Sequence, residues 1–167
     1  MAASHETLPS ERYSRQTMLP QIGLEGQERL RAARVLIVGL GGLGAPVATY
    51  LAGAGVGHIA LCDPDTVSLS NLQRQTLYAE ADLGKPKAEC ALSRLRAMNS
   101  EIELTAVPEG ITPENARRLV DDCELVVDCT DNFATRYLID DTCAAAGRPW
   151  VYGACLLYTS PSPRDRG

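Results

Sequence analysis

The sequence predicts an α/β domain with a Rossmann-like, mostly parallel sheet and helices on both of its faces. Three observations support this prediction. Short apolar runs alternate with segments of helical periodicity along most of the chain. A glycine-rich turn, Gly39 to Gly44, directly follows the first apolar run, and an acidic residue, Asp63, ends the second one. Together these features are typical of a nucleotide-binding strand–turn–helix unit.

The elements follow from the pattern in chain order. Residues 1–33 are polar and helix-prone, and we expect them to form an N-terminal helical arm, with residues 24–30 as a short amphipathic piece. Strands are expected at residues 34–39, 58–62, 102–107, 124–128 and 149–153, and helices near residues 43–54, 86–98, 113–121 and 133–146. A ligand site should lie at the carboxyl ends of the strands, where Gly39, Asp63 and Asp131 are found.

The C-terminal residues 155–167 do not continue this pattern. Pro161 and Pro163 would break any helix or central strand. The segment also resembles the translation of a transposase-based sequencing adapter. We therefore expect a non-native, disordered tail on a natural chain that is cut near Ala154, and the alternative is a natural disordered C-terminus.

Composition excludes several classes of function. The chain has 167 residues, which suits one domain, and its net charge of −5 argues against nucleic-acid binding. It has no apolar segment long enough to span a membrane, and residues 1–11 lack a signal-peptide pattern, so a cytoplasmic protein is expected. None of the six cysteines form a C-x-x-C pair, and they are interpreted mainly as reduced core residues.

The glycine turn can hold a phosphate. Glycines at a strand–helix junction allow a tight turn and a close approach of the backbone to a ligand, and the helix start offers free N–H groups. Asp63 lies where a carboxylate can accept hydrogen bonds from a ribose. These features alone fit an NAD-dependent oxidoreductase equally well, and the glycines could also merely pack a helix against the sheet.

A second polar set narrows the prediction to a triphosphate. Arg74 and Lys87 could neutralise phosphate oxygens, and Asn71 and Gln73 could donate amide hydrogen bonds. Asp131 follows an apolar run and could hold Mg²⁺ near phosphates. Each residue also has a simpler explanation: Arg74 as a solvated charge, Lys87 as a first-turn helix residue after Pro86, and Asp131 as a helix cap.

The chain resembles the ubiquitin-activating-enzyme-like family in its bacterial branch, the ThiF, MoeB and HesA branch. That branch contains the molybdopterin-synthase and thiazole-biosynthesis adenylyltransferases, and residues 65–77 lean slightly to the molybdopterin side. The resemblance covers residues 12 to about 154. It rests on the segments Arg12–Gln16, Arg34–Gly44, Ala52–Gly57, Asp65–Gln75, Lys85–Lys87 and Val127–Asn132.

The resemblance implies a function and a set of roles. Family members use ATP and Mg²⁺ to adenylate the C-terminal glycine of a small ubiquitin-like sulfur carrier. ATP would then be bound by Gly39, Gly41, Gly42, Gly44, Asp63, Asp65, Asn71, Gln73, Arg74 and Lys87. Asp131 would serve Mg²⁺ and the reacting phosphate, and Arg15 would reach the ATP of the other subunit of a homodimer.

The family also has features that lie beyond Ala154. These are a substrate groove, a crossover loop and two C-x-x-C pairs for structural zinc, so no zinc ligands are expected here. We expect adenylyltransferase activity of the intact parent and an inactive fragment. The alternatives are an NAD-dependent oxidoreductase, which leaves Asn71, Gln73, Arg74 and Lys87 without a role, and a non-catalytic scaffold of the same fold.

Overall fold

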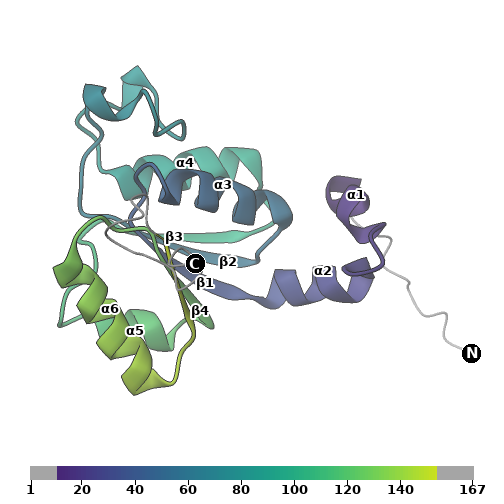
Figure 1. The fold of residues 1–167 in the computed structure, drawn as a ribbon. Coiled ribbons are helices and arrows are strands. Elements are labelled where there is room, and N and C mark those ends of the chain that lie inside the picture. Colours follow the sequence, from purple (N-terminus) through teal and green to yellow (C-terminus); the bar gives the residue numbers. More distant parts are fainter. Residues whose placement is uncertain (1–10, 154–167) are drawn as a thin grey trace, which may run out of the picture.

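A computed structural model describes residues 11–153. Five strands form one sheet in the order β3-β2-β1-β4-β5, and all four strand pairs are parallel (Figure 1). The strands are β1 (Arg34–Val38), β2 (His58–Cys62), β3 (Glu103–Val107), β4 (Leu125–Asp128) and β5 (Trp150–Tyr152). Because β2 and β4 lie on opposite sides of β1, the chain reverses its direction of travel across the sheet there, which is where open α/β sheets bind ligands.

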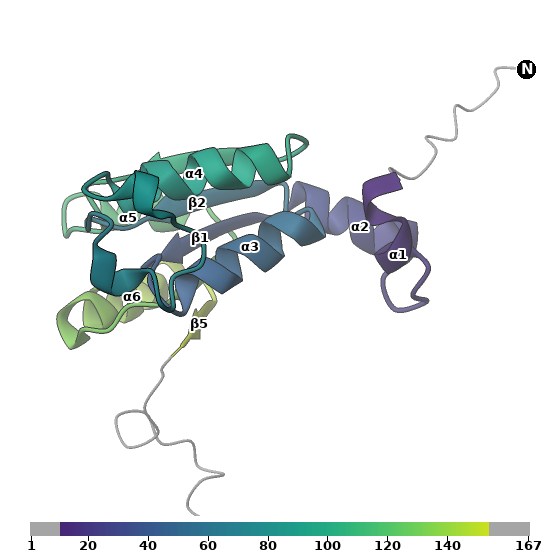
Figure 2. The same cartoon turned by 90° about the horizontal axis from the view of Figure 1, so that it is seen from above.

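Helices cover both faces of the sheet. The helices α3 (Gly44–Ala54) and α4 (Lys87–Met98) lie on one face, and α5 (Ala116–Asp121) and α6 (Phe133–Ala146) lie on the other (Figures 1 and 2). Each face has its own core: Ile37, Leu61 and Leu95 belong to the first, and Leu36, Val126 and Ile139 to the second. After the exposed Arg34, the central strand β1 is apolar because both of its faces are buried.

The helices begin and end where their sequences favour it. The helix α3 ends at Gly55 and α6 ends at Gly147, and both glycines adopt the left-handed conformation that closes a helix at little steric cost. The helix α6 begins after Asn132, whose Oδ1 accepts a hydrogen bond from the backbone N–H of Thr135 at 2.9 Å. Asn132 is therefore the cap, and the alternative that Asp131 caps this helix is wrong.

The N-terminal segment contains a 3₁₀ turn (Glu11–Tyr13) and the helices α1 (Ser14–Thr17) and α2 (Gly23–Ala32), which leads directly into β1. These helices extend from the amino-terminal end of the strands, away from the loops that follow the strands (Figures 1 and 2). The expected amphipathic piece at residues 24–30 lies within α2.

The predicted strands and helices agree with the structure to within one residue at almost every boundary. The exception is the helix expected to begin at residue 113, which begins at Ala116 because a turn spans residues 112–115. The sequence predicts no regular element between residues 63 and 86. It contains 3₁₀ turns at Leu69–Asn71 and Glu80–Asp82. The expected adapter-like tail lies outside the described residues.

Candidate functional site

Three loops meet at the carboxyl edge of the sheet. They follow β1, β2 and β4, and because β1 pairs with both neighbours, the loops are adjacent. The first carries the glycine turn, the second begins at Asp63, and the third contains Cys129 to Asp131. The predicted meeting of Gly39, Asp63 and Asp131 at one edge is confirmed by this strand order.

The glycine turn is packed tightly against the loop after β4. Gly39 has φ +87°, and a Cβ built there would lie 2.8 Å from the backbone oxygen of Cys129. A Cβ on Gly44 would lie 1.8 Å from the backbone oxygen of Gly39. Only glycine fits at either position, so the turn brings its backbone N–H groups to the start of α3, where a phosphate can bind.

Asp63 holds the glycine turn in place through hydrogen bonds to the backbone. Its buried carboxylate accepts hydrogen bonds from the backbone N–H of Leu40 at 2.6 Å and of Asp65 at 2.8 Å. Burial raises the pKa of Asp63 above its ordinary value, and these two hydrogen bonds and the charge of Lys87 partly offset that effect. Asp63 thus has a structural task besides the expected ribose contact, for which each oxygen retains one lone pair.

Lys87 is a buried cation beside this loop. Its Nζ lies 2.9 Å from Oδ2 of Asp65, and its side chain is 6% exposed whereas that of Asp65 is 69% exposed. The helix α4 begins at Lys87, as the simpler explanation proposed. An ordinary first-turn lysine is solvated, whereas this one is buried and has Asp65 as its charged partner.

The loop at residues 69–78 brings polar side chains over the glycine turn. A Cβ on Gly42 would lie 3.5 Å from Cδ of Arg74, so the arginine stem runs alongside this glycine. The Arg74 guanidinium donates from Nη1 to the backbone oxygen of Ser70 at 3.2 Å and is otherwise exposed. Asn71 caps the turn at residues 69–71 by accepting from the backbone N–H of Ser68, and Gln73 is exposed.

Two neighbours of Arg74 were missed as site residues. Gln75 is buried, its Oε1 has no hydrogen-bond partner, and its Nε2 would lie 3.4 Å from a Cβ on Gly41. Tyr78 donates from its hydroxyl to the backbone oxygen of Leu40 at 2.9 Å. Tyr78 therefore supports the glycine turn and Gln75 lies close to it. In the sequence, Gln75 stood out only as the end of the segment Asp65–Gln75, and Tyr78 had no signal.

Asp131 is exposed at the end of the loop after β4. The loop is held by Asp128, whose fully buried Oδ1 accepts from the N–H and the hydroxyl of Thr130 at 2.8 and 2.6 Å. Arg136 contacts this loop. Its Nε lies 3.9 Å from Oδ2 of Asp128, and its Nη2 donates to the backbone oxygens of Thr130 and Gly153. Neither Asp128 nor Arg136 has a role predicted from the sequence.

Arg15 is not part of this cluster. It lies on α1, which contacts the C-terminal end of α3 through a hydrogen bond of 2.8 Å from Nε2 of Gln16 to the backbone oxygen of Ala54. The glycine turn lies at the other end of α3, whose 11 residues are about 16 Å long. The structure therefore separates Arg15 from the site of its own chain.

The cysteines near the site are poor nucleophiles. Burial raises the pKa of Cys129 to about 11 and that of Cys62 to about 12. Thiols with such pKa values are protonated at neutral pH. All five cysteines of the described residues are free, and Cys62, Cys123 and Cys143 are buried, as expected for reduced core residues.

The edge fits a magnesium-bound nucleoside triphosphate in its donor set. Mg²⁺ is commonly held by one or two carboxylates together with substrate phosphates, and Asp131 offers an exposed carboxylate on the loop next to the glycine turn. Within residues 11–153 there is no group of three or more His, Cys, Asp and Glu side chains that could hold a metal ion by itself.

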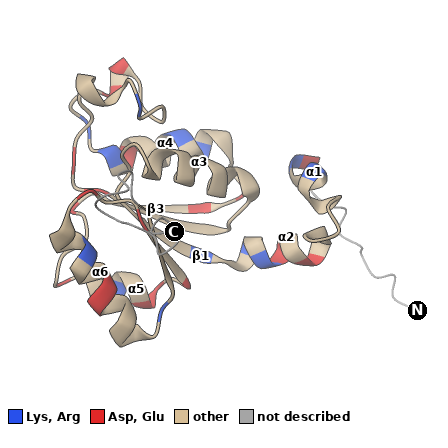
Figure 3. Cartoon of the chain, viewed as in Figure 1, with Lys and Arg blue, Asp and Glu red and all other residues tan. Residues whose placement is uncertain are grey.

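No helix of these residues is long and apolar enough to cross a bilayer. Acidic and basic segments are interspersed rather than separated by sign (Figure 3).

Comparison with known proteins extends this picture. A model of the ThiF family matches residues 13–161. The chain is 50% identical over 148 residues to a sulfur carrier protein adenylyltransferase of Thermus thermophilus, covering 89% of the chain and 55% of the relative. It is 50% identical over 147 residues to the adenylyltransferase and sulfurtransferase MOCS3 of Mus musculus, covering 88% of the chain and 32% of that protein. The chain thus spans about half and about a third of the lengths of these relatives.

Solved structures of related proteins share the fold. The tRNA N6-threonylcarbamoyladenosine dehydratase TcdA of E. coli, in complex with ATP, is 28% identical with a TM-score of 0.79, covering 84% of this chain and 58% of its own. MccB of E. coli, with AMPCPP and MccA, is 30% identical with a TM-score of 0.77, covering 89% and 45%. Both structures share the Rossmann-like fold that this chain adopts.

Proposed function

This chain belongs to the ThiF family, and from that premise we propose that it provides the ATP site of an adenylyltransferase. The substrate is the C-terminal glycine carboxylate of a small ubiquitin-like sulfur-carrier protein. Names of relatives at 50% identity support the reaction, and the crystallised complexes of TcdA with ATP and of MccB with AMPCPP support the nucleotide.

The observation that carries this proposal is the gathering of a glycine turn, a buried cation and an exposed arginine at one edge. Lys87 is held beside the loop of Asp65, and Arg74 lies alongside Gly42. An NAD-dependent enzyme would leave these two cations without a role, because the diphosphate of NAD binds at the glycine turn and the helix start. A triphosphate has more charge to neutralise and does give them one.

The chemistry needs no protein nucleophile. An oxygen of the carrier carboxylate attacks the α-phosphorus of ATP, the bond from that phosphorus to the bridging oxygen breaks, and pyrophosphate leaves. The products are the acyl-adenylate and pyrophosphate. Two anions must approach each other, so the site must spread negative charge and hold both groups in line. The high pKa of Cys129 agrees with a reaction that uses no thiolate here.

Each residue then has a task. Backbone N–H groups of the glycine turn, Lys87 and Arg74 hold the phosphates. Asn71 and Gln73 lie in the same loop as Arg74 and border the phosphate site. Bound Mg²⁺ would neutralise charge on the triphosphate. We assign Asp131 as the carboxylate that would hold it. Asp63 keeps the turn in shape and offers its remaining lone pairs to the ribose.

The test is ATP–pyrophosphate exchange by the full-length protein with a purified sulfur carrier. We expect exchange that requires both Mg²⁺ and the carrier's C-terminal glycine, and that disappears when the carrier is shortened by that glycine. Protection against thermal unfolding by NADH but not by Mg-ATP would instead favour an oxidoreductase. Comparing molybdopterin and thiazole carriers as substrates would decide the pathway.

A further inference from the structure

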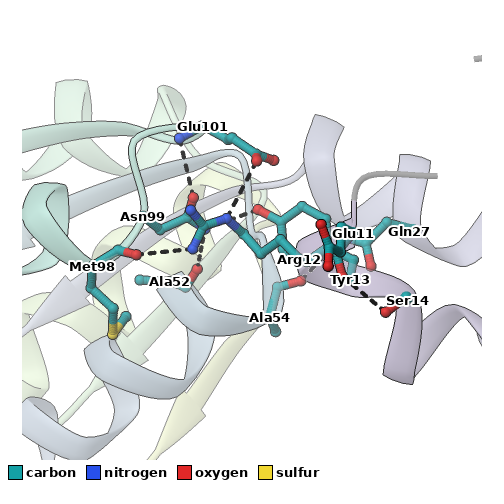
Figure 4. A network of polar contacts seen from close by, with 10 residues as sticks. All are labelled: Glu11, Arg12, Tyr13, Ser14, Gln27, Ala52, Ala54, Met98, Asn99 and Glu101. Atoms are coloured by element: carbon teal, nitrogen blue, oxygen red, sulfur yellow. Dashed lines mark hydrogen bonds and ion pairs between the residues drawn. The ribbon is translucent and has the colours of Figure 1, made fainter. Parts of the chain in front are cut away.

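The network around Asn99 shows how this protein satisfies a buried amide side chain (Figure 4). Asn99 is fully buried, and its Nδ2 donates to the hydroxyl of Tyr13 at 2.9 Å and to the backbone oxygen of Ala52 at 2.7 Å. Its Oδ1 accepts from the backbone N–H of Glu101 at 3.1 Å. These partners matter because an amide that leaves water without gaining hydrogen bonds in the protein destabilises the folded state.

Gln75 is the exception among the three buried amide side chains of residues 11–153. The third, Gln27, donates from Nε2 to the backbone oxygen of Ala54 at 3.1 Å, and its Oε1 accepts from Gln16. Gln75 is 3% exposed, its Oε1 has no hydrogen-bond partner, and its Nε2 makes no hydrogen bond with these residues. An unsatisfied buried amide does not serve the stability of the fold, so its presence needs another explanation.

The backbone around Gln75 holds its side chain in place. The N–H of Gln75 donates to the backbone oxygen of Asn71 at 2.9 Å, and its carbonyl oxygen accepts from the N–H of Tyr78 at 3.2 Å. The Tyr78 hydroxyl donates to the backbone oxygen of Leu40 at 2.9 Å, which attaches this segment to the glycine turn. The position of the Gln75 amide is therefore set by the protein itself.

The nitrogen end of this amide lies beside Gly41. A Cβ built on Gly41 would have Nε2 of Gln75 at 3.4 Å and, apart from the neighbouring residues in the chain, no other described atom within 4 Å. The backbone N–H groups of Gly41 and Gly42 make no hydrogen bond with the described residues, and the Arg74 side chain lies alongside Gly42. All of these groups are donors, so the space that they border fits an anionic acceptor.

We propose that Gln75 is a further binding residue of the nucleotide site and that its Nε2 donates to an oxygen of the polyphosphate held at Gly41. The inference rests on the ATP site of the proposed function. A phosphate oxygen supplies the acceptor that Nε2 lacks in the protein, and a hydrogen bond to an anion is stronger than one between neutral groups. Gln75 therefore lowers the stability of the free protein and raises its affinity for the ligand.

The test compares Gln75→Met with the wild-type full-length protein. Methionine keeps the length of the side chain and removes both polar ends. We expect the Kd for Mg-ATP, measured by titration calorimetry, to rise by about tenfold or more, as loss of one hydrogen bond to a charged group causes. The urea midpoint of the ligand-free variant should equal or exceed that of the wild-type protein, because an unsatisfied polar group has left the interior.

Two other glutamines calibrate these measurements. Gln27→Met removes a buried amide that has partners, so it should lower the urea midpoint. Gln21→Met removes an exposed amide and should leave both the urea midpoint and the Kd for Mg-ATP unchanged. If Gln75→Met lowered the urea midpoint as much as Gln27→Met does, the amide would serve the fold and the inference would be overturned.

A second ligand and a second variant identify the contact. Magnesium tripolyphosphate carries three phosphates without the nucleoside, and its Kd should also rise in Gln75→Met. Gln75→Glu keeps the shape of the side chain and puts an acceptor where a donor is needed, so it should weaken Mg-ATP binding at least as much as methionine does. An unchanged Kd for tripolyphosphate, or tighter Mg-ATP binding by Gln75→Glu, would overturn the assignment of Nε2 to a phosphate oxygen.

The outcomes separate this inference from the proposed reaction, because calorimetry requires no carrier protein. An unchanged Kd for Mg-ATP in Gln75→Met, in a protein that performs pyrophosphate exchange, would overturn the role of Gln75 alone. A wild-type protein that binds Mg-ATP but performs no exchange with its carrier would overturn the adenylation, and the Kd values would still decide the role of Gln75. A wild-type protein that does not bind Mg-ATP would overturn both.

Discussion

Lys87 and Asp65 form an ion pair of 2.9 Å in which the lysine is buried and the aspartate is exposed. This asymmetry places a desolvated cation at the floor of the site with its counterion on the open side. Asp65 therefore offsets part of the free-energy cost of removing the Lys87 ammonium from water. In the proposed function, the same ammonium is one of the cations that bind the triphosphate.

Replacement of Lys87 by methionine should remove this charge while keeping the length of the side chain. We expect pyrophosphate exchange to fall by at least about a hundredfold, which is typical for loss of one charge-stabilising group. The control is Lys85→Met, because Lys85 is only two residues away and its side chain is 60% exposed. Equal losses in the two variants would argue against a specific role of Lys87.

Gly44, at the end of the glycine turn, and Gly53, further along α3, should respond oppositely to replacement by alanine. Gly44→Ala places a Cβ 1.8 Å from the backbone oxygen of Gly39, and we expect it to lower the free energy of unfolding by more than about 2 kcal/mol. Gly53→Ala lies in the same helix α3 with nothing within 4 Å, and it should stabilise by about 0.5 to 1 kcal/mol. Urea unfolding measures both. A tolerated Gly44→Ala would contradict the packing described here.

Arg136 should be important for stability although it was not recognised in the sequence. Arg136→Leu leaves the fully buried Asp128 without its positive neighbour and frees the backbone oxygens of Thr130 and Gly153. We expect a loss of about 3 kcal/mol in the free energy of unfolding. Arg117→Leu, which breaks an exposed pair with Asp121 at 2.7 Å, should cost at most about 0.5 kcal/mol. Similar losses in both variants would show that burial of the pair does not matter.

Asp63 gives the protein a pH dependence of known sign. Because burial raises its pKa in the folded state above the ordinary 3.8, the native state holds this proton more tightly than the unfolded chain does. Its contribution to stability is complete below pH 3.8 and is lost as the pH rises through the raised pKa.

Comparison with Asp63→Asn isolates this contribution. The asparagine variant cannot titrate at this position, so the difference in unfolding free energy between the wild-type protein and the variant should shrink as the pH rises above 3.8 and then become constant. Urea unfolding at a series of pH values measures that difference. A difference that grows with pH would mean that the two N–H donors from Leu40 and Asp65 outweigh burial and lower the pKa.

Much of the fold could be predicted because its signals are local. The run Val35 to Val38 is buried on both faces, the glycines permit one sharp turn, and the helix before Asn99 shows a one-sided apolar stripe. The connection between Asp63 and Lys87 could not be predicted, because it has no period and is held by contacts such as the bridge between Thr66 and Pro86. Its polar residues were recognised as candidates only by type and by resemblance.

The sequence by itself determined the order of strands and helices, the glycine turn and the residue types at the carboxyl edge, since these depend on periodicity and backbone sterics. Only the tertiary structure decided which of those residues are buried and what they contact. In the folded chain, Asp63 holds the glycine turn and Lys87 is buried beside Asp65. Arg15 lies on α1, near the end of α3 that is far from the glycine turn. Burial and distance arise from contacts between segments far apart in the chain, and no local pattern encodes them.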